Sequence, residues 1–175
     1  SGFGCMEYYK KHDEIPAMGF SPDAEFPIIN SEKGILTFTF NAEFDNHDGM
    51  GVQILSLEGG RRPNMVPDFA KARLKGDVAA IQSAVKAAQT AGENMSISIS
   101  EDEAEIRSFG VSAHGSTPEK GKNAVMKLVK TLGTLDLTDS QRKFIDFLNT
   151  YVGEDTTGSR LHIDFSDEFS GALSF

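Results

Sequence analysis

Cysteine and tryptophan are nearly absent from this sequence of 175 residues, which contains only Cys5 and no Trp. A single cysteine excludes an internal disulfide and a zinc cage built from several thiolates. It is compatible with a reducing cytoplasm, where we expect the protein. Long apolar runs are also missing, so no membrane-spanning helix is predicted. The first residues lack the charged and apolar regions of a secretory signal peptide.

Positive charge is scarce as well. The chain has 17 Lys and Arg residues against 26 Asp and Glu residues, which gives a formal net charge of −9. Proteins that follow nucleic-acid phosphates concentrate positive charge, so we expect no nucleic-acid partner, and nothing indicates a membrane anchor. Hydrophobic residues at 39% and charged residues at 25% are typical of a globular domain with a real core.

Alternating apolar residues predict several strands. We expect strands over residues 35–40, 52–57, 69–75 and 161–165, a hairpin made by residues 95–100 and 104–112, and the beginning of a strand at 172–175. A change of composition at Ser31–Gly34 predicts a domain boundary. Because the chain ends in an unfinished strand and lacks an initiator Met, we expect it to be a piece of a longer protein.

Capping residues predict three longer helices. One begins after Asp77 and ends near Gly92, one follows Pro118, and one follows the capping-box pattern Thr138-x-x-Gln141. The last helix has a broad apolar surface, through which, or through exposed strands, we expect self-association. The order of elements predicts an α+β fold, in which helices pack on one face of an antiparallel sheet in a split β-α-β arrangement.

One histidine stands between a predicted strand and a predicted helix start, within Gly110–Gly121. Thr117 is a candidate N-cap before Pro118, and Ser116 with Glu119 forms a competing capping box. A helix N-terminus near His114 would disfavour the imidazolium, so the ring could donate a hydrogen bond to developing negative charge. The alternative is a solvent-exposed turn histidine.

Two further residues are candidates for a site. Asp23 follows Pro22 in a constrained, mostly apolar stretch, where a carboxylate can be held for a metal; the alternative is a turn aspartate. Asn64 follows Pro63 in a stiff loop and could point its amide at a substrate oxygen, although a plain turn asparagine has the same pattern. The other histidines lack metal-ligand spacing, and Ser116 lacks the G-x-S-x-G pattern of a serine hydrolase.

Three segments together resemble a known family. FSPDAEFPI at 20–28, NMVPD at 64–68 and GVSAHGSTPEKGKNA at 110–124 look like consecutive segments of bacterial Xaa-His dipeptidases. These are carnosinase-like members of the dinuclear zinc peptidase family that also holds glutamate carboxypeptidases and aminoacylases. The resemblance implies a zinc-dependent dipeptidase in which an α+β lid interrupts an α/β zinc-binding domain.

The same resemblance implies roles for parts of this chain. Residues 1–34 would be a strip of the catalytic domain, and residues 35–175 most of the lid, truncated at its C-terminal end. Asp23 matches a zinc ligand, His114 a lid histidine that stabilises the oxyanion, and Asn64 a lid asparagine near the substrate carbonyl. We expect two zinc ions in the complete enzyme, no stable zinc binding by this chain alone, and no catalysis by it. The competing hypothesis is a stand-alone α+β binding or dimerisation module.

Overall fold

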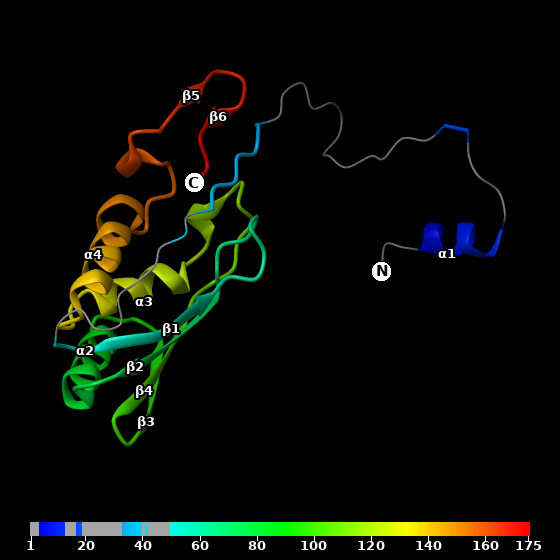
Figure 1. Cartoon of the computed structure of the whole chain (residues 1–175). Coiled ribbons are helices and arrows are strands. Elements are labelled where there is room, and N and C mark those ends of the chain that lie inside the picture. Colours follow the sequence, from blue (N-terminus) through cyan, green and yellow to red (C-terminus); the bar gives the residue numbers. More distant parts are fainter. Residues whose placement is uncertain (1–3, 13–16, 19–32, 40, 42–49) are drawn as a thin grey trace. The chain divides into compact units, whose positions relative to one another are not determined.

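The computed structural model describes residues 4–12, 17–18, 33–39, 41 and 50–175 (Figure 1). The chain divides into two compact units, Ser1–Lys33 and Gly34–Phe175. In the first unit, helix α1 spans Gly4–Lys11, and the rings of Tyr8 and His12 stack with their centres 4.1 Å apart. The assignment of the two parts to a catalytic domain and a lid stays a prediction.

A four-stranded antiparallel sheet organises the second unit. Its strands are β1 (Gln53–Gly59), β2 (Phe69–Lys75), β3 (Met95–Ser100) and β4 (Glu103–Phe109), in the order β1-β2-β4-β3. The predicted strands at 52–57 and 69–75 and the predicted hairpin are confirmed. The α+β class with an antiparallel sheet is therefore confirmed too.

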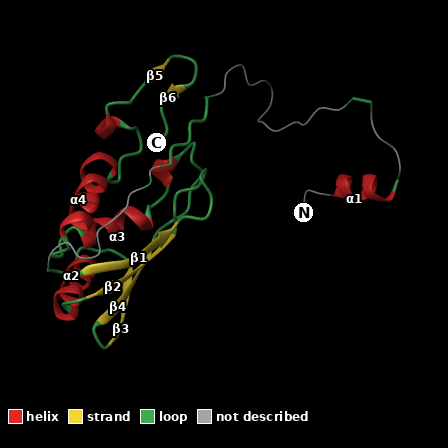
Figure 2. Ribbon diagram, in the orientation of Figure 1, coloured by secondary structure: helices red, strands yellow, loops and turns green. Residues whose placement is uncertain are grey.

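Helices cover one face of this sheet (Figure 2). They are α2 (Val78–Thr90), α3 (Ala124–Leu132) and α4 (Asp139–Phe147), and α4 continues into a π-helical turn over Leu148–Val152. Asp77 caps α2 as predicted, because its carboxylate accepts a hydrogen bond from Ala80 N at 3.0 Å. No helix in the described part of the chain is long and apolar enough to cross a membrane.

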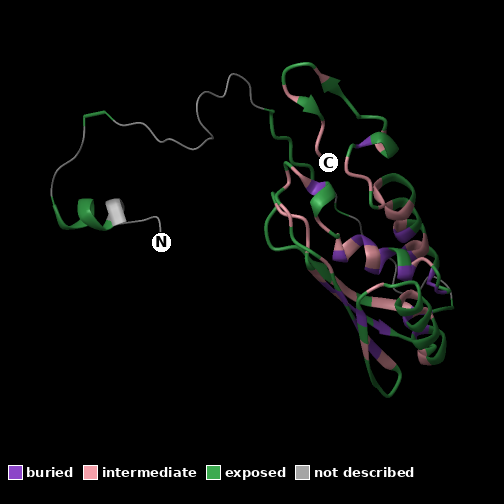
Figure 3. Cartoon of the chain, turned by 180° about the vertical axis from the view of Figure 1, so that it is seen from behind, coloured by how far each residue is buried: buried purple, intermediate pink, exposed green. Residues whose placement is uncertain are grey.

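The core lies between the sheet and the helices. Alternate residues of β2 and β4 point inward and are buried: Ala70, Ala72, Leu74, Ala104, Ile106 and Ser108. They pack against the apolar side of α3, which includes Leu128, Val129 and Leu132. Figure 3 shows buried segments in purple on both the strands and the helices. Strand alternation thus places one set of side chains in the core and the other set on the opposite face.

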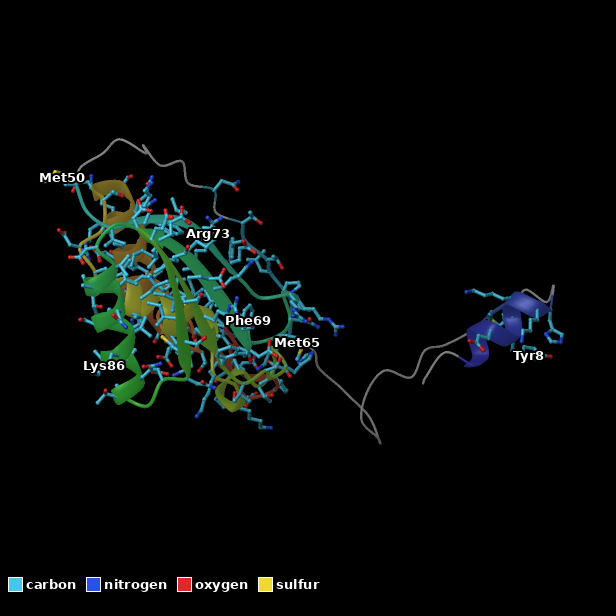
Figure 4. All side chains as sticks on the ribbon, turned by 90° about the horizontal axis from the view of Figure 1, so that it is seen from below. Tyr8, Met50, Met65, Phe69, Arg73 and Lys86 are labelled. Atoms are coloured by element: carbon cyan, nitrogen blue, oxygen red, sulfur yellow. The ribbon has the colours of Figure 1, made fainter. Side chains whose placement is uncertain are left out.

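That opposite face is polar. Its charged side chains form ion pairs between Lys71 and Glu58, Arg73 and Glu103, Lys75 and Asp102, and Arg107 and Glu105. Figure 4 labels Arg73 on this face. Because these pairs are largely exposed, each contributes little to stability. Within the described residues, helices thus cover one face of the sheet and charged side chains lie on the other.

The predicted strand at 35–40 is wrong in its described residues. Residues 33–39 form no regular structure, and Ile35 and Leu36 are 92% and 76% exposed. A strand needs a neighbouring strand, and the outer side of β1 is partly occupied by residues before α4. Val52 N donates to Asp136 O at 2.7 Å, and Val52 forms a parallel bridge with Leu137.

The predicted capping box at Thr138 is also wrong. The Thr138 side chain makes no capping hydrogen bond to α4. Gln141 instead turns to β1, where its amide oxygen accepts from Ile54 N at 2.7 Å and its amide nitrogen donates to Ile54 O at 2.9 Å. A β-bulge between Ile54 and Ser56 interrupts the register at this point, and the glutamine amide replaces a neighbouring strand's peptide group.

The predicted strand at 161–165 is wrong as well. Ser159–Leu161 forms a 3-10 turn, and His162 has a left-handed φ of 56°, which interrupts an extended run. Two-residue strands β5 (Ser166–Asp167) and β6 (Gly171–Ala172) pair further along. The strand expected to begin at 172–175 is reduced to the end of β6.

Candidate functional site

Two loops leave the same end of the sheet. Phe69, the first residue of β2, pairs with Phe109, the last residue of β4, and their rings are 5.6 Å apart. The loop before β2 and the loop after β4 therefore emerge together. Gly110 N donates to Asp68 O at 2.8 Å, which extends the pairing beyond the strands. Figure 4 labels Met65 in the first of these loops and Phe69 at its end.

The backbone pairing continues outward to the two predicted lid residues. Val66 N donates to Ala113 O at 2.9 Å, and Gly115 N donates to Asn64 O at 2.7 Å. Between these bonds, Met65 and His114 form an antiparallel bridge. The structure thus brings the backbones of residues 64–66 and 113–115 side by side, and we call this arrangement of the two loops the Asn64–His114 pairing.

A glycine makes this close approach possible. A Cβ on Gly115 would lie 3.1 Å from Asn64 O, which is tighter than ordinary contact. Any side chain at this position would push the two loops apart by a few tenths of an ångström. Gly115 therefore serves the pairing of the loops, in addition to freeing the turn after His114.

The long helix predicted to begin at Pro118 begins later than expected. Pro118–Lys120 makes only a 3-10 turn, and Thr117 makes no capping hydrogen bond. Helix α3 begins at Ala124, where the Asn123 side chain accepts from Met126 N at 3.1 Å. Before α3 begins, Lys122 pairs with Val111 in an antiparallel bridge. The dipole of α3 therefore does not explain the chemistry of His114.

The His114 ring instead interacts with the turn that follows it. His114 is exposed, and its Nδ1 lies 2.8 Å from Ser116 Oγ and 3.2 Å from Ser116 N, which donates to it. Thr117 N donates to His114 O at 2.9 Å and closes the turn. Nε2 has no hydrogen-bond partner among the described residues. One ring nitrogen is thus engaged by the turn, and the other is available to a ligand.

Asn64 lies in a turn stiffened by proline. Met65 N donates to Arg62 O at 3.3 Å, and Pro63 stands inside this turn, where its fixed φ is favourable. The Asn64 side chain is exposed. The structure therefore places an amide and an imidazole on two adjoining, stiffened loops, and both can hydrogen-bond a carbonyl oxygen.

The one predicted metal ligand, Asp23, lies outside the described residues. Within the described ranges, no group of three or more His, Cys, Asp or Glu residues could hold a metal ion. In the first unit, His12 uses its Nδ1 on its own helix, at 2.9 Å from Tyr8 O.

The sequence predicts Ser116 as a candidate helix cap and not as a partner of His114, whereas its hydroxyl and its N–H both contact the imidazole. The signal was the spacing His-x-Ser within a glycine-containing turn, because a serine two residues on can reach back to a side chain.

Comparison with known proteins gives related sequences but no matching family model. The chain is 35% identical over 177 residues to "Putative dipeptidase YtjP" of Bacillus subtilis. The aligned region covers 99% of this chain and 38% of that protein. It is 34% identical over 172 residues to "Beta-Ala-Xaa dipeptidase" of Lactobacillus delbrueckii, covering 97% of this chain and 36% of that protein. The chain thus spans well under half the length of these relatives.

Proposed function

We propose that this chain is the lid-containing part of a zinc-dependent dipeptidase of the cytoplasm, which hydrolyses the peptide bond of dipeptides. Similarity to proteins named dipeptidases runs along nearly the whole chain. The observation that supports the proposal most is the Asn64–His114 pairing. It joins, by a 2.7 Å backbone hydrogen bond, the loops of the two residues expected to approach a substrate carbonyl.

The proposed chemistry assigns His114 to the oxyanion. When water attacks the carbon of a peptide bond, the carbonyl oxygen gains negative charge and needs a hydrogen-bond donor already in position. His114 donates from Nε2 to this oxygen, and Asn64 holds the substrate beside it. Loss of one such donor typically costs about 3 kcal/mol of transition-state stabilisation.

Zinc belongs to the proposal but does not fit the described residues alone. A catalytic zinc takes about three protein ligands and, when bound, lowers the pKa of its water. The described part of the chain offers no such group. We propose Asp23 as one ligand, which other residues of the complete enzyme would have to join.

The oxyanion role is tested by His114→Ala in a complete dipeptidase that contains this sequence. We expect kcat to fall about 100-fold with unchanged zinc content, which is the loss expected for one oxyanion donor. His162→Asn is the control, because His162 is exposed and asparagine tolerates its left-handed φ of 56°. An unchanged kcat in His114→Ala would refute the assignment.

The proposal also predicts that the isolated chain of 175 residues is catalytically silent with zinc added. The measurement is dipeptide hydrolysis by the purified chain, followed by separation of the products. Hydrolysis that depends on added zinc and disappears with a chelator would contradict this expectation.

The alternative function, a stand-alone binding or dimerisation module, is favoured by one observation. Strand β3 lies at the end of the strand order, and no described strand pairs with its outer side. An open edge of this kind can pair with another chain. A stable, zinc-free dimer of the 175-residue chain, broken by a proline within β3, would support the module.

A further inference from the structure

We infer that Ser116 is a positioning residue that holds the neutral His114 ring in the tautomer protonated at Nε2. The inference about the tautomer stands on the geometry of the turn. Its catalytic consequence rests on the proposed function, because only the tautomer protonated at Nε2 can donate a hydrogen bond to an oxyanion from the free side of the ring.

The backbone of Ser116 decides which ring nitrogen accepts. Its N–H can only donate, and it points at His114 Nδ1 over 3.2 Å. Nδ1 must therefore have its lone pair free, and the single ring proton of a neutral imidazole stands on Nε2. The opposite tautomer would set two N–H groups against each other.

The hydroxyl of Ser116 strengthens the same preference. Ser116 Oγ lies 2.8 Å from Nδ1, a normal length for a hydrogen bond. A hydroxyl can donate or accept, but beside a nitrogen that already receives an N–H it acts as a second donor. The shorter of the two contacts therefore also orients the ring, so that Nε2 faces away from the turn.

The turn is itself fixed on three sides. Thr117 N bonds to His114 O at 2.9 Å, Gly115 N bonds to Asn64 O at 2.7 Å, and Ser174 Oγ donates to Ser116 O at 3.3 Å. Because the backbone is held at 115, 116 and 117, Ser116 is presented to the ring with little conformational freedom. A rotating surface serine would not fix a tautomer in this way.

The tautomer is measured directly by NMR of the ¹⁵N-labelled 175-residue chain in alkaline solution. The His114 signals are assigned by their loss in His114→Gln. We expect Nδ1 to resonate as an unprotonated and Nε2 as a protonated nitrogen, with a stronger bias than at the exposed His162. In Ser116→Ala the bias should fall toward that of His162, and in Ser116→Thr it should return.

The matched control is Ser112→Ala, an exposed serine of the same loop, which should leave the His114 signals unchanged. Equal tautomer bias at His114 and His162 in the unaltered chain would overturn the inference. An unaltered bias in Ser116→Ala would assign the tautomer to the backbone N–H alone and would overturn the role of the side chain.

Kinetics of the complete dipeptidase test the consequence. Ser116→Ala should lower kcat roughly tenfold with little change in KM, less than the full loss of an oxyanion donor. Ser116→Thr should restore the rate, and Ser112→Ala should not alter it. Because Ser116 acts through the ring, the double variant with His114→Ala should be no slower than His114→Ala alone.

The two proposals fail differently. If His114→Ala keeps full activity while the NMR bias depends on Ser116, the proposed function is refuted and the positioning of the ring stands. If His114→Ala is slow but Ser116→Ala is as fast as the unaltered enzyme, the oxyanion role stands and the catalytic part of this inference is refuted.

Discussion

Replacement of Gln141 by leucine is expected to loosen the attachment of α4 to the sheet. Gln141 is only 6% exposed, and its amide makes two hydrogen bonds to the backbone of Ile54, at 2.7 and 2.9 Å. Leucine has a similar volume, so Gln141→Leu removes these bonds without leaving a large cavity. The substitution therefore isolates the polar contribution of one side chain to the edge of β1.

The magnitude follows from the two bonds. Each buried hydrogen bond contributes about 1 kcal/mol net, and a buried group left without a partner costs about 1–3 kcal/mol. Ile54 is only partly buried, so water can reach part of its backbone and the lower range applies. We expect Gln141→Leu to lower the free energy of unfolding by about 2–4 kcal/mol.

Urea unfolding of the 175-residue chain, followed by circular dichroism, measures this loss. Lys143→Leu is the matched control on the same helix, since Lys143 is exposed, and it should change stability by less than about 0.5 kcal/mol. Gln141→Glu should be at least as destabilising as Gln141→Leu at neutral pH, because it buries a carboxylate that cannot donate to Ile54 O. If Gln141→Leu were as stable as Lys143→Leu, the structural role of the amide would be refuted.

Two further substitutions test the energetics of the second unit. Ser108 is fully buried in the core, and its hydroxyl has no partner in the described part of the chain. Ser108→Ala should therefore raise the free energy of unfolding by about 1 kcal/mol in urea, and a loss of similar size would contradict this. Burial alone would raise the pKa of Asp155. Hydrogen bonds from Arg160 N, Thr157 and Ser159 to its carboxylate outweigh this effect and bring the pKa down to about 2. Since the folded pKa lies below the unfolded value, the unaltered chain should exceed Asp155→Asn in thermal stability at pH 7. It should lose that advantage between about pH 4 and pH 2; a constant difference across this range would refute the reasoning.

The strands of the sheet could be predicted because residues of different polarity alternate along them and so mark a buried and an exposed face. In β2, apolar Ala70, Ala72 and Leu74 alternate with basic residues, so the pattern predicts the strand and also which side is buried. The neighbouring strand β4 alternates in the same way. These two strands pair with each other, and each meets a further partner on its other side.

The same pattern failed where the described residues supply no partner strand. Ile35 and Leu36 belong to an alternating run, yet both are exposed and lie outside any strand. Alternation describes how a segment would divide its side chains between two faces. It does not say whether a neighbour supplies the hydrogen bonds, and at β1 the neighbouring positions are taken by residues before α4 and by Gln141.

In the candidate site, too, some features depend on residues that are neighbours in the sequence and others on residues far apart in it. The turn from His114 to Thr117 depends on residues next to one another, so its shape and the approach of Ser116 to the ring were within reach of the sequence. The start of α3 was not, because Thr117 and Asn123 are both good caps and a bridge between Val111 and Lys122 decides between them. The meeting of Asn64 with Gly115 depends on the register of β2 against β4, which continues into both loops. The proposed site therefore needs the sheet to be formed, so substitutions that disturb that register should impair the site without touching either side chain.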